Sequence, residues 1–109
     1  MRHLLYVDPE KRFVITAITW LPGQVSAVHG HHVWCAFGVA EGELTEDQFD
    51  ATLFKTKTNV YRAGDLADRD LEQRVIHRVS NAGHVPVVSL HLYGVSADRL
   101  TTGINRLYA

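Results

Sequence analysis

Short runs of β-branched and aromatic residues, separated by turn-forming pairs, most strongly constrain the fold of this chain. The pairs are Asp8-Pro9, Pro22-Gly23, Glu41-Gly42, Ala63-Gly64 and Ala82-Gly83, and these residue types favour turns. The runs cover residues 3–7, 13–20, 33–40, 52–61, 75–79, 85–93 and 100–108. Strands and turns at this spacing predict an all-β protein, an antiparallel sandwich or barrel. Only residues 45–50 and 66–73 have a pattern that could carry a helical turn.

The composition limits the classes of protein to which the chain can belong. Its 109 residues predict a single domain over residues 1–109, and 46% hydrophobic residues allow a packed core. The formal net charge of -1 argues against a nucleic-acid-binding surface. No apolar run approaches the roughly 18–20 residues of a membrane span. The single cysteine, Cys35, cannot form an internal disulfide, which fits a reducing cytoplasm.

The chain is rich in histidine, with seven in all. His29 and His31 flank Gly30, so on a strand their side chains point to the same side, with Cα atoms about 7 Å apart. Two imidazoles on one strand can occupy adjacent positions around a metal ion. The same alternation predicts that Cys35 lies on this face. His77 lies on a different predicted strand.

A second polar group lies near the end of the run at residues 85–93. Ser89, His91 and Tyr93 share one face of this strand, and Leu90 and Leu92 share the other. A polar face backed by leucines is the reverse of ordinary core patterning. Either this face is exposed to solvent, or it lines a cavity with a chemical use.

Two motifs carry a resemblance to the cupin superfamily. The spacing Gly23-x5-His29-x-His31-x3-Cys35-x6-Gly42 resembles the first cupin motif, with Cys35 in place of the customary glutamate ligand. The segment His77-x3-Asn81 resembles the core of the second motif. Without the glutamate, the ligand set is similar to the three-histidine iron site of the cysteine dioxygenase family. Further runs similar to that family are Arg2-His3-Leu4-Leu5-Tyr6, Trp20-x-Pro22-Gly23, Trp34-Cys35, Glu41-Gly42-Glu43, Ile76-His77-Arg78-Val79 and Ser89-Leu90-His91-Leu92-Tyr93-Gly94.

The resemblance implies a fold, a cofactor and an activity. The fold would be the cupin double-stranded β-helix, a small antiparallel barrel or jelly roll. His29, His31 and His77 would bind one Fe(II) per chain and leave positions for a thiolate and for dioxygen. The activity would be a thiol dioxygenase that converts a small carboxylated thiol, L-cysteine or 3-mercaptopropionate, into a sulfinate. The sequence leaves the choice between these thiols open.

The resemblance also implies roles for residues around the metal ligands. Ser89, His91 and Tyr93 would form an outer-sphere hydrogen-bonded triad. Arg2 stands where the family places the arginine that pairs with the substrate carboxylate. Cys35 lies near the position from which some family members form a thioether crosslink to the triad tyrosine, here Tyr93.

Other functions and partners remain open at this point. A non-catalytic cupin that binds a metal or small ligand, as a sensor or storage module, has the same motifs. So does a different three-histidine cupin enzyme, such as an isomerase or a carbon-cleaving dioxygenase. The expected partners are a small thiol and dioxygen, with no nucleic acid and no membrane, and a homodimer could cover an exposed barrel edge. The helical N-terminal region of full-length family members is expected to be absent, because the sequence begins just before Arg2.

Overall fold

The computed structural model describes residues 2–31, 34–69, 75–97 and 105–107, with the backbone alone described at residues 31, 68–69 and 105–107. In this part of the chain the strands form two sheets of five strands each. The first sheet has the order β1-β2-β9-β4-β7. Its strands are β1 (Arg2–Val7), β2 (Val14–Trp20), β9 (Val87–Tyr93), β4 (Cys35–Glu41) and β7 (Leu66–Arg69).

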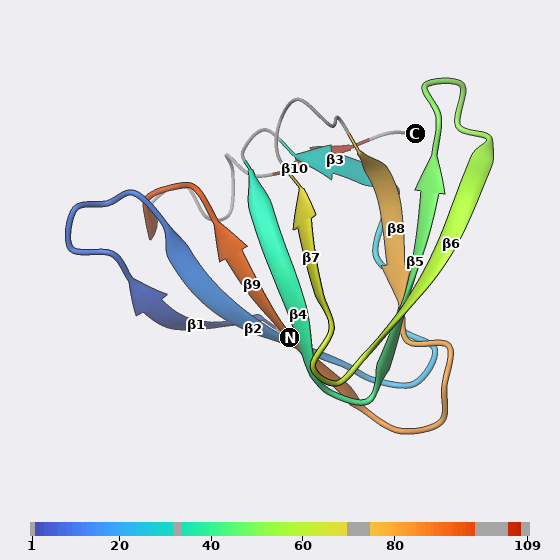
Figure 1. Ribbon diagram of the computed structural model, residues 1–109, viewed down its shortest axis with the longest axis horizontal. Coiled ribbons are helices and arrows are strands. Elements are labelled where there is room, and N and C mark those ends of the chain that lie inside the picture. The colour runs from blue at the N-terminus through green and yellow to red at the C-terminus, as the bar shows by residue number, and fades with distance from the viewer. Residues whose placement is uncertain (1, 32–33, 70–74, 98–104, 108–109) are drawn as a thin grey trace.

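The second sheet has the order β10-β3-β8-β5-β6. Its strands are β10 (Asn105–Leu107), β3 (His29–His31), β8 (Ile76–Ser80), β5 (Glu43–Phe49) and β6 (Lys55–Arg62). Every described strand pairing is antiparallel. Figure 1 shows the two sheets as two walls that meet at the lower end of the view and lie further apart at the upper end. No helix of the length and apolarity needed to cross a membrane occurs among the described residues.

The all-β prediction is confirmed, and each predicted run contains a described strand. The helical turn expected at residues 45–50 is wrong, because residues 45–49 belong to β5. Leu44 and Glu46 are both fully buried on this strand, and a glutamate on the inner face hides the alternation that marks a strand. The helical turn expected at residues 66–73 is also wrong for residues 66–69, which pair with β4 as an edge strand. Residues 70–73, 100–104 and 108 lie outside the described part.

Side chains from both sheets form the core. Its largest cluster consists of buried apolar residues on β2, β4, β5, β7, β8 and β9: Trp20, Phe37, Val39, Leu44, Ala67, Val79 and Val87. The turn from β4 to β5, which leads from one sheet to the other, requires Gly42. Its φ is 82°, and a Cβ at this position would lie 2.9 Å from Val87 Cγ2. Close packing of the turn against β9 therefore excludes other residues.

Candidate metal centre

Two of the predicted metal ligands meet between neighbouring strands. His29 on β3 and His77 on β8 are directly opposite each other in the antiparallel register. Their Nε2 atoms are 3.1 Å apart, and their ring centroids are 4.6 Å apart with 61° between the ring planes. The fold therefore brings together two histidines that are 48 positions apart in the sequence.

The hydrogen bonds of the two rings place their protons away from this meeting point. His29 Nδ1 lies 2.8 Å from the carbonyl oxygen of Ala27, and His77 Nδ1 lies 2.7 Å from Glu46 Oε2. Both partners can only accept when Glu46 is ionised, so each neutral ring carries its proton on Nδ1. Each Nε2 then presents a lone pair toward the other ring.

This arrangement fits a shared cation. Two imidazole nitrogens bound to one metal at about 2.1 Å, on adjacent coordination positions, lie about 3.0–3.4 Å apart. The 3.1 Å between the two Nε2 atoms is within this range. Burial lowers the pKa of His29 to about 4, with a smaller contribution from repulsion by His77 when that ring is protonated, so the His29 ring is neutral near pH 7, as metal binding requires.

The third predicted ligand, His31, lies on β3 two positions beyond His29. Its backbone pairs with Asn105 of β10, and its side chain lies outside the described part. Among the described side chains, no group of three His, Cys, Asp or Glu residues is placed to hold a metal ion. The described structure thus brings two of the three predicted ligands together, and metal binding by His29, His31 and His77 stays a prediction.

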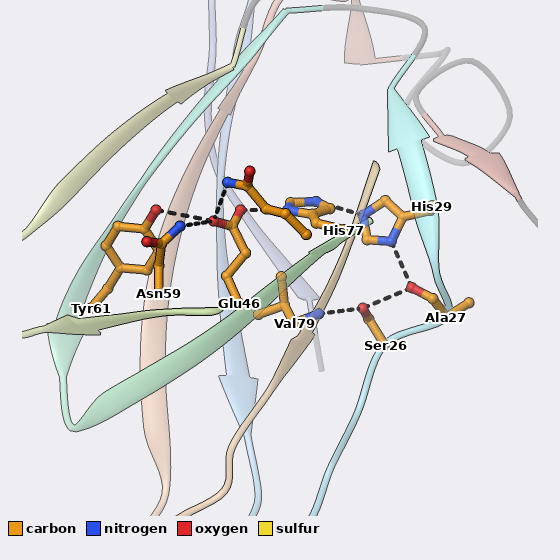
Figure 2. A network of polar contacts seen from close by, with 9 residues as sticks. Ser26, Ala27, His29, Glu46, Asn59, Tyr61, His77 and Val79 are labelled. Atoms are coloured by element: carbon orange, nitrogen blue, oxygen red, sulfur yellow. Dashed lines mark hydrogen bonds and ion pairs between the residues drawn. The ribbon is translucent and has the colours of Figure 1, made fainter. Parts of the chain in front are cut away.

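Sequence reasoning missed Glu46, which contacts one of these ligands. Its carboxylate is fully buried and receives hydrogen bonds from Gln48 Nε2 (3.0 Å), Asn59 Nδ2 (3.0 Å) and Tyr61 Oη (3.1 Å), all at Oε1. Figure 2 shows Glu46 between Tyr61 and Asn59 on one side and His77 on the other. Burial raises the pKa of Glu46, but the hydrogen bonds from His77, Gln48 and Asn59 outweigh it and hold the pKa below its usual value.

The two histidines line a cavity of about 130 Å³ between the sheets. Both sheets contribute to the wall of the cavity. The wall includes predicted metal ligands, members of the predicted β9 triad, the predicted carboxylate-binding arginine and the cysteine of the predicted crosslink. The described residues that line it are Arg2, Ile18, Trp20, Ser26, Ala27, His29, Cys35, Phe37, His77, Val79, His91 and Tyr93.

The polar face of β9 points into the protein, as one of the two sequence alternatives predicted. Ser89, His91 and Tyr93 are all buried, and the last two line the cavity. Ser89 Oγ lies 2.7 Å from His91 Nε2 and accepts a hydrogen bond from Trp20 Nε1 at 2.9 Å. The rings of His91 and Tyr93 stack with 5.9 Å between their centroids. The three side chains therefore form a chain from the core to the cavity.

The surroundings determine the protonation of these two rings. Burial, with a smaller contribution from the charge of Arg2, lowers the pKa of His91 to about 3. Burial raises the pKa of Tyr93 to about 12. Near neutral pH the imidazole is therefore uncharged and the phenol keeps its proton, so Tyr93 can donate a hydrogen bond into the cavity.

Arg2 and Cys35 both reach the cavity. The Arg2 guanidinium carbon lies 5.6 Å from the centroid of the Tyr93 ring, and no other Lys or Arg lines the cavity among the described residues. Cys35 is buried and lies opposite Tyr93 in the register of β4 and β9. The sequence placed Cys35 with His29 by continuing one strand's alternation. In fact β3 and β4 belong to different sheets, and the two residues share the cavity because the sheets face each other.

Comparisons with known proteins agree with this architecture. The chain is similar to an uncharacterised conserved protein with a double-stranded β-helix domain from Klebsiella pneumoniae subsp. pneumoniae, with a TM-score of 0.74 and 21% identity over 100% of this chain and 84% of that chain. It is similar to a Cupin 2 conserved barrel domain protein from Salinispora arenicola, with a TM-score of 0.69 and 21% identity over 93% of this chain and 82% of that one.

Two further comparisons extend the result. Oxalate decarboxylase from Bacillus subtilis, a protein with Mn(II) centres, matches with a TM-score of 0.66 and 23% identity over 79% of this chain and 22% of that chain. Together the solved structures show that the fold is the cupin double-stranded β-helix. The family model described as cysteine dioxygenase type I matches residues 2–101.

Proposed function

Because this chain belongs to the cysteine dioxygenase type I family, we propose that it is a mononuclear non-haem Fe(II) thiol dioxygenase. It would add both atoms of dioxygen to the sulfur of a small carboxylated thiol, L-cysteine or 3-mercaptopropionate. The thiolate and dioxygen together contain every atom of the sulfinate product, so the reaction needs no other oxidant. The observation that carries the proposal is one small cavity lined by His29 and His77, the Tyr93 ring and Arg2.

The residues present fit a ferrous ion. His29, His77 and the predicted ligand His31 would hold it, and the described pair already has proton positions and spacing suited to a shared cation. When bound, the iron would favour the thiolate form of the substrate, whose proton is released to water, and would supply the one-electron chemistry by which dioxygen reacts with sulfur. The chain itself supplies the shape of the cavity, its charge and its hydrogen-bond donors.

Arg2 would bind the carboxylate of the substrate. A guanidinium is a planar fork that suits a carboxylate, and this one lies beside the cavity over Tyr93. The Tyr93 hydroxyl would donate a hydrogen bond to the reacting groups, and His91, held by Ser89, would support the Tyr93 ring by stacking. A cavity of about 130 Å³ suits a ligand of few atoms, since a cavity of about 150 Å³ accommodates benzene.

Cys35 and Tyr93 are cross-strand neighbours, and the side chains of such pairs lie about 4.5–5.5 Å apart at Cβ. A thioether between them stays a prediction. Intact-mass measurement after aerobic turnover would detect it as the loss of two hydrogen atoms, and a Cys35→Ala variant would not show this loss.

Oxygen uptake tests the proposed function. Iron-loaded protein is expected to consume dioxygen with L-cysteine or 3-mercaptopropionate, and the His77→Ala variant is expected not to. Tight iron binding without thiol-dependent uptake would instead support a sensor or storage cupin and would refute the enzyme.

Substrate comparison tests the role of Arg2. Arg2→Gln should raise KM for a carboxylated thiol about tenfold or more, as expected for the loss of one charge-assisted hydrogen bond worth about 1.5–3 kcal/mol. It should leave KM unchanged for 2-aminoethanethiol, which has no carboxylate. Equal effects on both thiols would refute carboxylate binding by Arg2.

A further inference from the structure

Glu46 is a buried carboxylate that has no part in the proposed reaction. It lies on β5 and is not among the described residues that line the cavity, but it contacts one of them, His77. Its neighbour along the strand, Asp47, carries the same functional group but bonds Arg78 Nη2 (2.9 Å) and Thr58 Oγ1 (2.7 Å) instead. Two adjacent carboxylates thus have different partners, and only Glu46 contacts a proposed metal ligand.

The two carboxylate oxygens of Glu46 have different hydrogen-bond partners. Oε1 accepts from the side chains of Gln48, Asn59 and Tyr61. Oε2 lies 2.7 Å from His77 Nδ1. Three donors on one oxygen fix the carboxylate in position, so the other oxygen has a defined direction and can orient the imidazole.

We propose that Glu46 is a positioning residue that keeps the proton of His77 on Nδ1 and so presents the Nε2 lone pair to the metal. A carboxylate at this distance has no proton to donate, so Nδ1 must be the donor. A carboxylate behind a histidine ligand also makes the ligand more basic. The sequence has Cys35 where cupins have a glutamate ligand, and Glu46 places a negative charge behind one ligand instead. This inference rests on the proposed function only in taking His77 as a ligand.

The substitution Glu46→Gln tests this because it keeps size and shape and changes one atom. An amide has one oxygen and one NH2 group. If the oxygen stays with the three donors at the Oε1 position, the NH2 group faces His77 Nδ1. His77 must then accept at Nδ1 and carry its proton on Nε2, where a metal would have to bind. The variant should therefore reverse the tautomer of His77.

Nitrogen-15 NMR of the histidine rings reads the tautomer in metal-free protein. We expect Nδ1–H for His77 in the unsubstituted protein and Nε2–H in Glu46→Gln. Anaerobic titration with Fe²⁺ should show about 10- to 100-fold weaker binding for Glu46→Gln, the range for loss of an outer-shell partner. Asp47→Asn makes the same chemical change one residue away. It should keep the tautomer and bind Fe²⁺ within about twofold of the unsubstituted protein.

The tautomer of the unsubstituted protein is decisive even if Glu46→Gln does not fold. An Nε2–H form of His77 in that protein would overturn the inference, and so would an Fe²⁺ affinity of folded Glu46→Gln equal to that of Asp47→Asn. Neither measurement depends on turnover. If oxygen uptake fails while the tautomer and affinity results hold, the proposed activity is wrong and the role of Glu46 stands.

Discussion

Replacing Ser89 with alanine removes one hydroxyl that two buried groups share. Ser89 Oγ accepts the indole N–H of Trp20 at 2.9 Å and lies 2.7 Å from His91 Nε2. Ser89 is fully buried, and the other two residues are 7% exposed. The alanine variant leaves a methyl group where both partners need a polar atom, so we expect a loss of stability larger than that of one hydrogen bond.

The magnitude follows from the different surroundings of the two partners. The Trp20 indole belongs to the core cluster, where an unsatisfied donor costs about 1–3 kcal/mol. His91 lines the cavity, where water can replace the serine hydroxyl. Losing the hydrogen bond between Ser89 and His91 should therefore cost only the net value of one hydrogen bond, about 0.5–1.5 kcal/mol. The sum is about 1.5–4.5 kcal/mol. At about 4 °C per kcal/mol for a domain of this size, Tm should fall by about 6–18 °C.

Urea unfolding followed by circular dichroism measures this loss. A double-mutant cycle with Trp20→Phe isolates one of the two bonds, because phenylalanine has no N–H to leave unpaired. The loss of unfolding free energy caused by Ser89→Ala should be smaller in the Trp20→Phe background than in the unsubstituted protein, by at least about 1 kcal/mol. Ser96→Ala is a matched control, since the Ser96 hydroxyl makes no hydrogen bond within the described part of the chain, and should change stability by less than about 0.5 kcal/mol.

Two results would refute the reasoning. One is a Ser89→Ala cost below about 0.5 kcal/mol, which would mean that the buried donor is satisfied in another way. The other is the same cost with and without the indole N–H. That outcome would assign the whole effect to His91 or to packing.

Two further predictions concern stability. In metal-free protein, the pKa values of His29 (about 4) and His91 (about 3) lie below the ordinary 6.5, so below about pH 6.5 the unfolded chain binds more protons. The free energy of unfolding should therefore be highest above pH 6.5 and fall toward pH 4 by up to about 1.4 kcal/mol per pH unit for each histidine. Urea unfolding at a series of pH values should show that this free energy falls less steeply with pH in His91→Gln. The same dependence on pH in the variant would contradict the assignment to His91. Gly64→Ala should cost about 1–2 kcal/mol from positive φ alone, since nothing lies within 4 Å of its Cβ position. Gly42→Ala should cost about 1–3 kcal/mol more because of its contact with Val87, and equal costs in urea unfolding would contradict this packing argument.

The sequence alone predicted much of the fold because strands and turns leave local signals. Runs of β-branched residues and turn-forming pairs located most strands. Alternation on one strand led to the prediction that the two histidines flanking Gly30 bind a metal, and this stays a prediction. The polar face of β9 was recognisable for the same reason. Where the inner face carries a polar residue, as Glu46 does on β5, the local signal is lost and the strand was missed.

Only the tertiary structure decided which distant residues meet. The pairing of β3 with β8 places His29 against His77, and the pairing of β5 with β8 places Glu46 behind His77. Cys35 reaches the same cavity from the opposite sheet. Alternation within a strand says which side a residue faces, but strand register and the stacking of sheets depend on contacts far apart in the chain. Such contacts bring Glu46 to His77, which is 31 positions away in the sequence. A local sequence pattern carries no information about them.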